Sequence, residues 1–247
     1  MTLAPNLRKD ELVKRAQVYA ALVERRKNCH LCIGLCNPYD IERYRHLDTE
    51  IGPWSQWQGN LDATLMIVGQ DWGSVKFLES KFLGGGAEDR SNPTNKRLVQ
   101  LLANENIDID WKWRGRNSRL FFTNAVLCLR SGASNMQGKP NKDWFKNCVS
   151  ENFLREQIKI VNPKVVVGLG RLAFDSILRS FGLQSAFPSS ITLSEIVQDK
   201  SGVKLGTTRA RAFAVYHCGA AGWNINRTEQ QHYHDWKRIR KVLELSK

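Results

Sequence analysis

Four cysteines have the spacing of a metal centre: a close pair, Cys29 and Cys32, and a distant pair, Cys128 and Cys148. The two thiolates of Cys29-His-Leu-Cys32 can bind one metal or cluster together, but two ligands rarely complete such a site. The partners must therefore come from elsewhere in the chain. A site of this kind would join the start of the chain to its middle and place a metal next to Asn124.

An acid, an amide and an imidazole follow three separate apolar runs, as Asp71, Asn124 and His217. Asp71 can hold or polarise a water molecule. The amide of Asn124 can pair with a base edge that carries a carbonyl beside an N–H, and His217 can donate to an oxygen that gains negative charge. Singly, such residues are more often turn or capping residues. Because the predicted sheet brings all three to one face, we expect a functional site there.

Four apolar runs, alternating with helical patterns, must position these side chains. The runs are rich in Val, Ile, Leu and Phe, as buried parallel strands are, and cover 63–69, 120–126, 164–169 and 211–216. Helical spacing of apolar residues predicts helices over 10–27, 94–103, 143–160, 171–181 and 228–245. The alternation predicts an α/β fold, a three-layer α/β/α sandwich with a small, mainly four-stranded parallel sheet. Ligands of such sheets bind beyond the carboxyl ends of the strands. The polar stretch 185–206 is predicted to be an excursion from the sheet.

The composition favours a basic, globular, nucleic-acid-binding protein. The chain has 247 residues, 42% of them hydrophobic, and a formal net charge of +13. We expect one domain over 1–247, with the segment 1–60 packed onto it. The positive charge favours a polyanion as partner. Six cysteines without a signal-peptide pattern or a membrane-spanning run favour a cytoplasmic protein with reduced thiols and no membrane partner. We expect it to be a monomer.

Several of these blocks resemble the uracil-DNA glycosylase superfamily. Gly69-Gln-Asp71 matches the opening of Gly-Gln-Asp-Pro-Tyr-His, the first motif of the classical uracil-DNA glycosylases. The run Asn124-Ala-Val-Leu, with Arg130 after it, resembles the second strand of the same enzymes. The stretch 162–170 is similar to their third strand, and Tyr216-His217 resembles the start of their closing motif.

The cysteines resemble the iron–sulfur branch of this superfamily, found in bacteria and archaea. That branch has a Cys-x-x-Cys before the first strand, a Thr-Asn-Ala-Val-x-Cys strand, and a further Cys in the next helix. Thr123-Asn-Ala-Val-Leu-Cys128 reproduces the strand, and Cys148 falls in the expected helix. The resemblance implies a 4Fe-4S cluster held by Cys29, Cys32, Cys128 and Cys148. Zinc suits the same ligands and remains the alternative. Cys36 could replace one ligand, and Cys218 is expected in the core or the pocket wall.

The resemblance implies a monofunctional DNA repair glycosylase that hydrolyses the N-glycosidic bond of uracil in DNA and leaves an abasic site. The base must be extruded into a pocket, and the sugar passes through an oxocarbenium-like transition state. Asp71 would stabilise the sugar cation and orient the attacking water, and His217 would bond the uracil oxygen that gains charge. Asn124 would read the uracil edge. The other site residues implied are Gly69, Gln70, Gly73 and Phe82 for the substrate, with Phe77 as the competitor for stacking, and Arg227 for DNA.

Two departures from the family pattern bear on this function. The closing motif lacks its usual Pro and Ser after His217, and Gly73 stands where the classical branch has a tyrosine that excludes thymine. The second departure predicts that other deaminated or C5-modified bases are accepted. Two further functions stay open: a catalytically inactive DNA-binding protein with the same fold, and a small-molecule nucleotide-binding protein. The latter is disfavoured, because no Gly-x-Gly-x-x-Gly opens a helix after the first strand.

Overall fold

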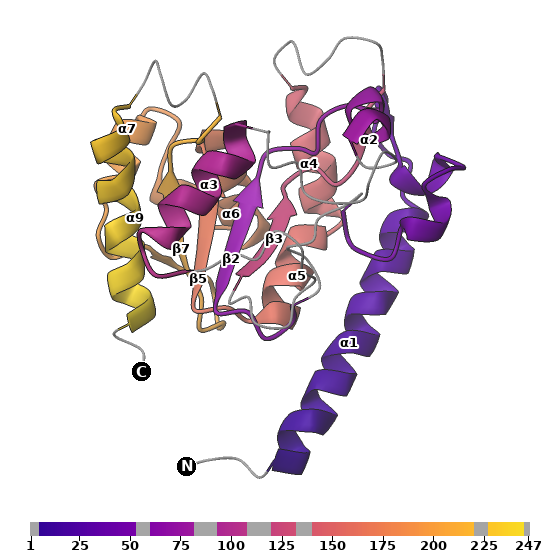
Figure 1. Ribbon diagram of the computed structural model, residues 1–247, viewed down its shortest axis with the longest axis horizontal. Helices are drawn as coiled ribbons and strands as arrows, with labels where there is room; N and C mark the ends of the chain where they lie inside the picture. The colour runs from indigo at the N-terminus through magenta and orange to yellow at the C-terminus, as the bar shows by residue number, and fades with distance from the viewer. Residues whose placement is uncertain are drawn as a thin grey trace.

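A parallel sheet forms the centre of this computed structural model, which describes residues 5–52, 60–81, 93–107, 120–131, 140–219 and 227–244. Its parallel strands are β2 (Leu65–Gly69), β3 (Leu120–Asn124), β5 (Val165–Leu169) and β7 (Arg211–Val215). The short β6 (Val203–Lys204) pairs antiparallel with β7, so the strand order is β3-β2-β5-β7-β6 (Figure 1). The predicted parallel sheet is confirmed. It gains an antiparallel edge strand from the predicted excursion, because two residues are too few to give a recognisable pattern.

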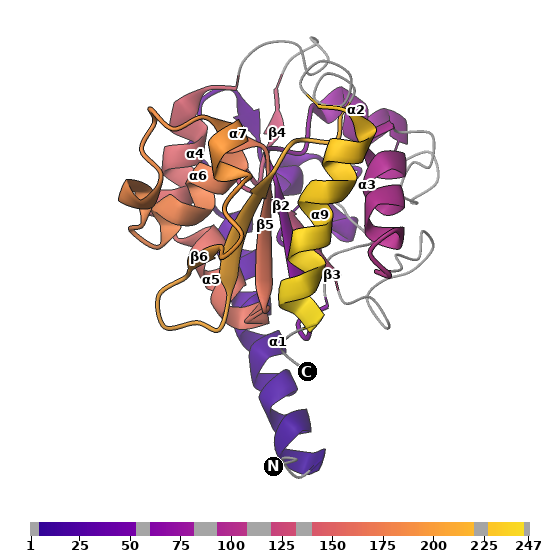
Figure 2. The same cartoon turned by 90° about the vertical axis from the view of Figure 1, so that its left-hand side faces the viewer.

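Helices cover both faces of the sheet, which gives the predicted three layers (Figure 2). One face carries α3 (Pro93–Ala103) and α9 (Glu229–Glu244). The other carries α4 (Lys142–Ser150), α5 (Phe153–Val161) and α6 (Arg171–Ser180). Successive residues of a strand point to opposite faces, so a strand buried on both sides is apolar throughout.

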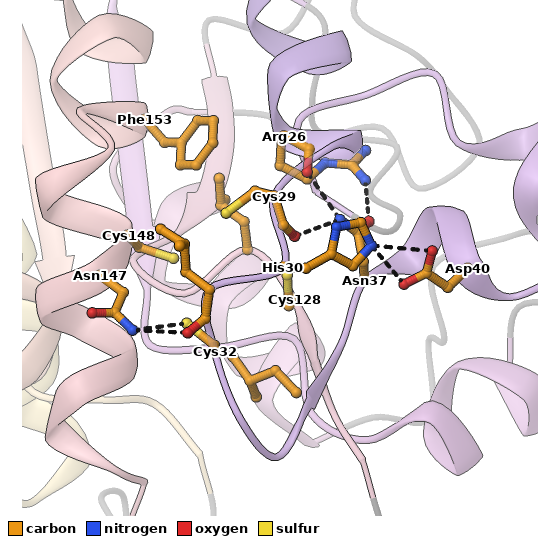
Figure 3. Close-up of a pocket in the computed structure, with 13 residues that line it drawn as sticks. Arg26, Cys29, His30, Cys32, Asn37, Asp40, Cys128, Asn147, Cys148 and Phe153 are labelled. Atoms are coloured by element: carbon orange, nitrogen blue, oxygen red, sulfur yellow. Dashed lines mark hydrogen bonds and ion pairs between the residues drawn. The ribbon is translucent and has the colours of Figure 1, made fainter.

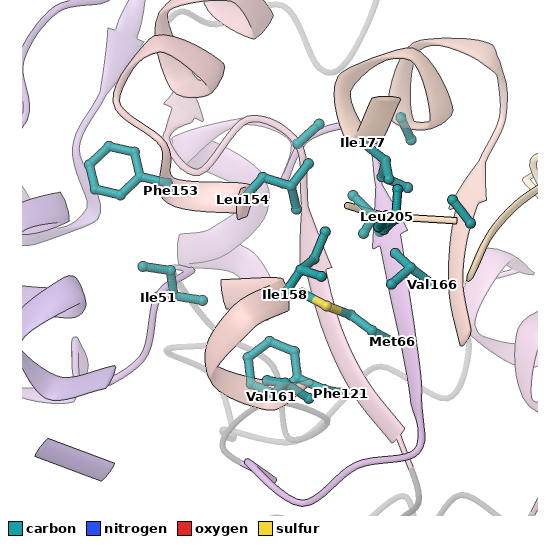
Figure 4. Packing of buried hydrophobic residues seen from close by; sticks show 14 of the residues in the cluster. Ile51, Met66, Phe121, Phe153, Leu154, Ile158, Val161, Val166, Ile177 and Leu205 are labelled. Atoms are coloured by element: carbon teal, nitrogen blue, oxygen red, sulfur yellow. The ribbon is translucent and has the colours of Figure 1, made fainter. Parts of the chain in front are cut away.

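The strand β2 shows how this double burial is achieved. Leu65 and Ile67 pack in the cluster that includes α3 and α9, whereas Met66 and Val68 pack in the cluster that includes α5 and α6. Figure 4 shows Met66 beside Ile158 of α5, with Phe121 and Val166 from the neighbouring strands. All four β2 side chains are fully buried.

The first helix, α1 (Pro5–Lys27), is attached to the rest of the fold by its carboxyl-terminal half. Leu22 and Val23 are buried in the cluster that includes α5, whereas Val13 and Val18 are more than half exposed. The amino-terminal half extends away from the sheet (Figures 1 and 2). No helix within the described ranges is long and apolar enough to cross a membrane.

The predicted helix over 143–160 is wrong in one respect, because the structure has two helices there. Asn152, between α4 and α5, has a φ of 58°, a left-handed conformation that breaks the helical hydrogen-bond pattern. An apolar period that continues across the break hides it in the sequence.

Several short elements went unpredicted. Two strands, β1 (Leu35–Cys36) and β4 (Leu129–Arg130), pair antiparallel as a separate ribbon. The short helices are α2 (Val75–Lys81) and α7 (Leu193–Ile196), and the 3₁₀ turns are η1 (Pro38–Asp40), η2 (Arg45–Leu47) and η3 (Gln184–Ala186).

Candidate active site and cysteine centre

The carboxyl ends of the parallel strands bring the predicted polar residues to one edge of the sheet. In the register of β2 and β3, Gly69 lies opposite Asn124. Beyond the strand ends, the Gly170 N–H donates to the Val215 carbonyl at 2.8 Å. The chain order reverses at β2, since β3 lies on one side of it and β5 on the other. Ligands of open α/β sheets bind at such a reversal.

Gly69 makes room for the Asn124 amide. A Cβ added at Gly69 would lie 2.1 Å from Asn124 Oδ1, far inside van der Waals contact. Asn124 is only 4% exposed, and within the described residues its amide makes no hydrogen bond. An amide that is largely buried without a partner is costly unless a ligand completes its hydrogen bonds. This arrangement suits an amide that reads a base edge.

Three donors hold the Asp71 carboxylate, whose side chain is 6% exposed. Arg130 Nη2 donates to Oδ2 at 2.7 Å, and Gln70 Nε2 donates to the same oxygen at 2.9 Å. The backbone N–H of Gly73 donates to Oδ1 at 3.0 Å. The sequence predicted Gln70 and Gly73 as substrate residues. Here they orient Asp71, and contact with a substrate stays a prediction for both.

His217 has the environment of a neutral hydrogen-bond donor. Burial lowers its pKa below the ordinary value, and the negative charge of nearby Asp71 opposes this shift without cancelling it. Nδ1 accepts a hydrogen bond from the Gly219 N–H at 2.9 Å, so a neutral ring carries its proton on Nε2. A Cβ on Gly219 would lie 2.7 Å from Nδ1, so glycine is needed for this approach.

The space beside the candidate pocket differs from what a tyrosine would leave. Gly73 has a φ of 83°, a conformation that side-chain-bearing residues rarely adopt, so the backbone itself disfavours a tyrosine there. The neighbouring Trp72 packs against Gly52, where a Cβ would meet the indole at 2.3 Å, and edge-on against Phe122. Trp72 is therefore held in place by its packing among buried residues, and the predicted loss of the tyrosine barrier stays a prediction.

Arg227 is occupied inside the protein. Its guanidinium forms a bidentate ion pair with Asp235 of α9 and lies over the Tyr216 ring, 4.7 Å from the ring centroid. The Arg227 side chain is 14% exposed and that of Asp235 is 2% exposed. These contacts fix the chain after the closing loop to α9. A direct contact between Arg227 and DNA stays a prediction.

Three predicted features lie outside the described residues and side chains. Phe82 and the closing loop over 220–226 fall outside the described residues. Phe77 lies on α2, but its side chain is also outside the description. Which of the two rings stacks on a base therefore stays a prediction.

All four predicted cysteine ligands line one cavity of about 220 Å³ (Figure 3). Cys29 and Cys32 come from the segment after α1, Cys128 from the turn before β4, and Cys148 from α4. Burial raises the pKa of Cys148 to about 12 and raises that of Cys128 as well, with smaller contributions from the other thiols of the set. Burial keeps such thiols protonated, whereas a bound metal removes the proton outright.

A four-iron cluster and a single zinc ion require different distances between the sulfurs that line this cavity. Among the described residues, no three His, Cys, Asp or Glu side chains are close enough together to hold one metal ion. Zinc at 2.3 Å from each sulfur requires sulfurs about 3.8 Å apart, whereas each thiolate of a four-iron cluster binds a different iron and the sulfurs stand further apart. Which of the two groups the four cysteines hold stays a prediction.

Neighbouring polar groups organise this cavity. Asn147 Nδ2 lies 3.5 Å from Cys32 Sγ and can donate to it. Asn37 donates to three backbone carbonyls, including that of Cys29 at 3.0 Å, and accepts from the buried Arg26. Cys36 is absent from the cavity lining, which disfavours it as a ligand, and Cys218 is buried in the core beside α9.

Sequence reasoning missed two of these residues as parts of the site. Arg130 was noted only as part of a resemblance, and nothing in the spacing links it to Asp71, 59 positions earlier. Asn147 stands next to Cys148, and its place beside a predicted ligand was the one signal that could have identified it.

A parallel α/β sheet that places an acid, an amide and a neutral imidazole at one edge belongs to the class that binds and transforms ligands there. The family model described as the uracil DNA glycosylase superfamily matches residues 56–238. The chain belongs to this superfamily. It is also similar to the "Type-5 uracil-DNA glycosylase" of Pyrobaculum aerophilum, with 23% identity over 216 residues, 85% of this chain and 86% of that protein.

Proposed function

We propose that this protein is a monofunctional uracil-DNA glycosylase, which hydrolyses the N-glycosidic bond of deoxyuridine in DNA. Membership of the superfamily supports a DNA glycosylase-type function. The observation that carries the finer proposal is the nearly buried amide of Asn124, which makes no hydrogen bond within the described residues, at the same edge of the sheet as Asp71 and His217. A protein that only bound DNA would need none of these three groups.

The reaction begins when a deoxyuridine is extruded from the helix into the crevice. The Asn124 amide pairs with the carbonyl and N–H of the uracil edge. Cytosine is rejected because its amino group meets the amide's own donor. Each satisfied hydrogen bond then relieves the cost of leaving the buried amide unpaired.

The glycosidic bond breaks with positive charge on the sugar and negative charge on the departing uracil. Asp71 stabilises the sugar cation and orients the attacking water. The neutral His217 donates its Nε2–H to the uracil oxygen that gains charge. Because this ring is neutral, it acts through a hydrogen bond and keeps its own proton, while the proton lost by the attacking water passes to Asp71 or to the uracil anion.

The pocket should accept some bases beyond uracil. A wall excludes a methyl group only where atoms fill that space, and Gly73 supplies no side chain while Trp72 is held against Gly52. We propose that deaminated or C5-modified bases in weak pairs are substrates, whereas well-paired thymine is spared by the cost of extrusion.

We further propose that Cys29, Cys32, Cys128 and Cys148 hold a 4Fe-4S cluster. Its cavity supports this, since three separate segments bring the four cysteines together there. When bound, the cluster would supply structural cross-links among these segments. The chain's own Asn147 and Asn37 would orient the ligands.

The test is base release from a panel of oligonucleotides under single-turnover conditions. The panel carries uracil, 5-hydroxymethyluracil and thymine, each opposite guanine, with cytosine as the control. We expect fast release of uracil, slower release of 5-hydroxymethyluracil, and no release of cytosine. DNA binding without release of any base would instead support the inactive DNA-binding protein.

A further inference from the structure

We infer that Arg130 is a positioning residue for the glycosylase reaction, because it fixes the Asp71 carboxylate and ties it to the segment that carries Cys32 and Cys36. This inference rests on the proposed function and deepens it. Arg130 and Asp71 form a nearly buried ion pair, with side chains 14% and 6% exposed and Nη2 2.7 Å from Oδ2.

Arg130 holds the loop after β2 at two points. Its side chain bonds Asp71, and its backbone N–H donates to the Gly73 carbonyl at 2.8 Å. A parallel bridge between Ser74 and Arg130 extends this attachment. The side chain and the backbone of Arg130 therefore both attach β4 to the loop that carries Asp71, the candidate catalytic carboxylate.

The segment between Cys32 and Cys36, here called the cysteine segment, contacts Arg130 from the other side. Leu35 pairs with Arg130 in the β1–β4 ribbon, and the Ser131 N–H donates to the Gly34 carbonyl at 3.0 Å. The Arg130 guanidinium lies 5.9 Å from the centroid of the Trp144 ring, whose Nε1 donates to the Ile33 carbonyl at 2.9 Å. All of these partners lie between Cys32 and Cys36 or on α4, which carries Cys148.

The bonds to Asp71 also select which of its oxygens can act. An ionised carboxylate accepts about four hydrogen bonds, two at each oxygen. Within the described residues Oδ2 accepts from Arg130 and Gln70, whereas Oδ1 accepts only from the Gly73 N–H. The remaining acceptor position is therefore on Oδ1, and this oxygen is left to hold the attacking water.

A double-mutant cycle tests the positioning role. Arg130→Gln removes both the charge and the guanidinium group, whereas Arg130→Lys keeps only the charge. Both variants are made with and without Asp71→Asn. We expect Arg130→Gln to slow single-turnover uracil release by about 10- to 100-fold, as expected when a reacting group is misplaced. The dissociation constant for the same DNA should change far less than the single-turnover rate, because the change removes an interaction that acts in the transition state.

The decisive comparison is the double variant. If Arg130 acts through Asp71, Arg130→Gln added to Asp71→Asn should slow release by no more than about 3-fold further, because coupled residues are not additive. Arg211→Gln is the matched control, since Arg211 bonds the Ser201 and Gly202 carbonyls at the opposite end of the sheet. It should release uracil within about 2-fold of the unaltered chain, because surface changes away from a site have small effects.

Two measurements separate this inference from its alternatives. The iron content of Arg130→Gln should equal that of the unaltered chain; loss of iron would place Arg130 at the cysteine centre and overturn the inference. Additive rate losses, or unaltered rates in both Arg130 variants, would overturn it too. The same cycle in the free energy of unfolding tests the ion pair without catalysis. If the Arg130 and Asp71 changes were coupled in the free energy of unfolding but the protein released no uracil, Arg130 would still hold Asp71. The proposed function would then fail on its own.

Discussion

At the scale of residues, the site depends on close approaches that glycines permit. At Gly69 the absence of a side chain leaves room for the Asn124 amide. At Gly219 it lets the backbone N–H approach Nδ1 of His217. In both places a side chain would displace a functional group, so each glycine acts through the residue beside it. The sequence predicted Gly69 as a substrate residue. In this structure it leaves room for the Asn124 amide, and contact with a substrate stays a prediction.

Gly69→Ala tests this indirect role. The new Cβ would meet Asn124 Oδ1 at 2.1 Å, so the amide must move. We expect uracil release to slow by about 100-fold, since a displacement near 1 Å can cost that much. Asn124→Ala serves as the matched comparison. Combining the two changes should add little; a full additional loss would show that Gly69 acts on its own.

The pH dependence of the reaction tests the protonation of His217. Burial lowers its pKa below 6.5, with Asp71 opposing, so the ring is neutral at pH 6.5 and above. If the neutral ring is the active form, the rate is retained at pH 6.5 and falls only as the pH drops through the lowered pKa. We expect this acid limb to disappear from the pH–rate profile of His217→Gln. A rate that already falls between pH 8 and 7 would contradict a neutral ring.

At the scale of elements, the sequence was most informative where a whole segment consists of apolar residues. The strands β2 and β5 were predicted because they are buried on both faces and therefore apolar throughout. The break between α4 and α5 was missed, because one left-handed Asn152 does not interrupt the apolar period. The β1–β4 ribbon has two residues in each strand, and it pairs segments that lie about ninety positions apart, as no local pattern can indicate.

The residues of the candidate site also differ in how far the sequence could indicate them. The meeting of the four cysteines could be expected from their spacing and the resemblance, and that of Asp71, Asn124 and His217 from their places after strands; their roles stay predictions. Arg130 could not be assigned, because its role arises from a pairing between distant segments. The roles of Gln70 and Arg227 depend on partners that only the fold brings near them.

The cavity lined by the four cysteines gives a prediction about the metal content of the protein. Purified protein should be brown and contain about four irons per chain, as expected for a four-iron centre with four thiolates. Asn147→Ala removes the donor 3.5 Å from Cys32 Sγ. We expect its reduction potential to fall, because hydrogen bonds to sulfur stabilise the reduced, more negative cluster. Lys146→Ala, on the exposed side of α4, is the control. Colourless protein with stoichiometric zinc would contradict the cluster.

At the scale of the whole molecule, a net charge of +13 suits the polyanionic partner that the proposed function requires. Several arginines near α9 are nevertheless engaged inside the protein: Arg227 pairs with Asp235, and Arg238 donates to the Asp199 carbonyl at 2.5 Å. Contact of either arginine with DNA phosphates would therefore compete with a bond inside the protein.

Salt dependence measures how many cationic side chains contact phosphates. Affinity for an oligonucleotide carrying a stable abasic analogue should fall linearly on a log–log plot as salt rises, because bound cations release counterions. Arg227→Gln should leave the slope unchanged, since its charge is already paired with Asp235. A shallower slope for this variant, in a protein that remains folded, would restore the predicted DNA contact of Arg227.

The most direct measurement is single-turnover uracil release by the unaltered chain and by Asp71→Asn, with binding of the same DNA measured in parallel. Asparagine keeps the size of Asp71 but removes the charge that stabilises the sugar cation. We expect binding to change by less than about 3-fold and release to slow by at least about 100-fold, because one oriented charge contributes several kcal/mol to a charged transition state. Uracil release by Asp71→Asn at the rate of the unaltered chain would contradict the assignment of the catalytic carboxylate.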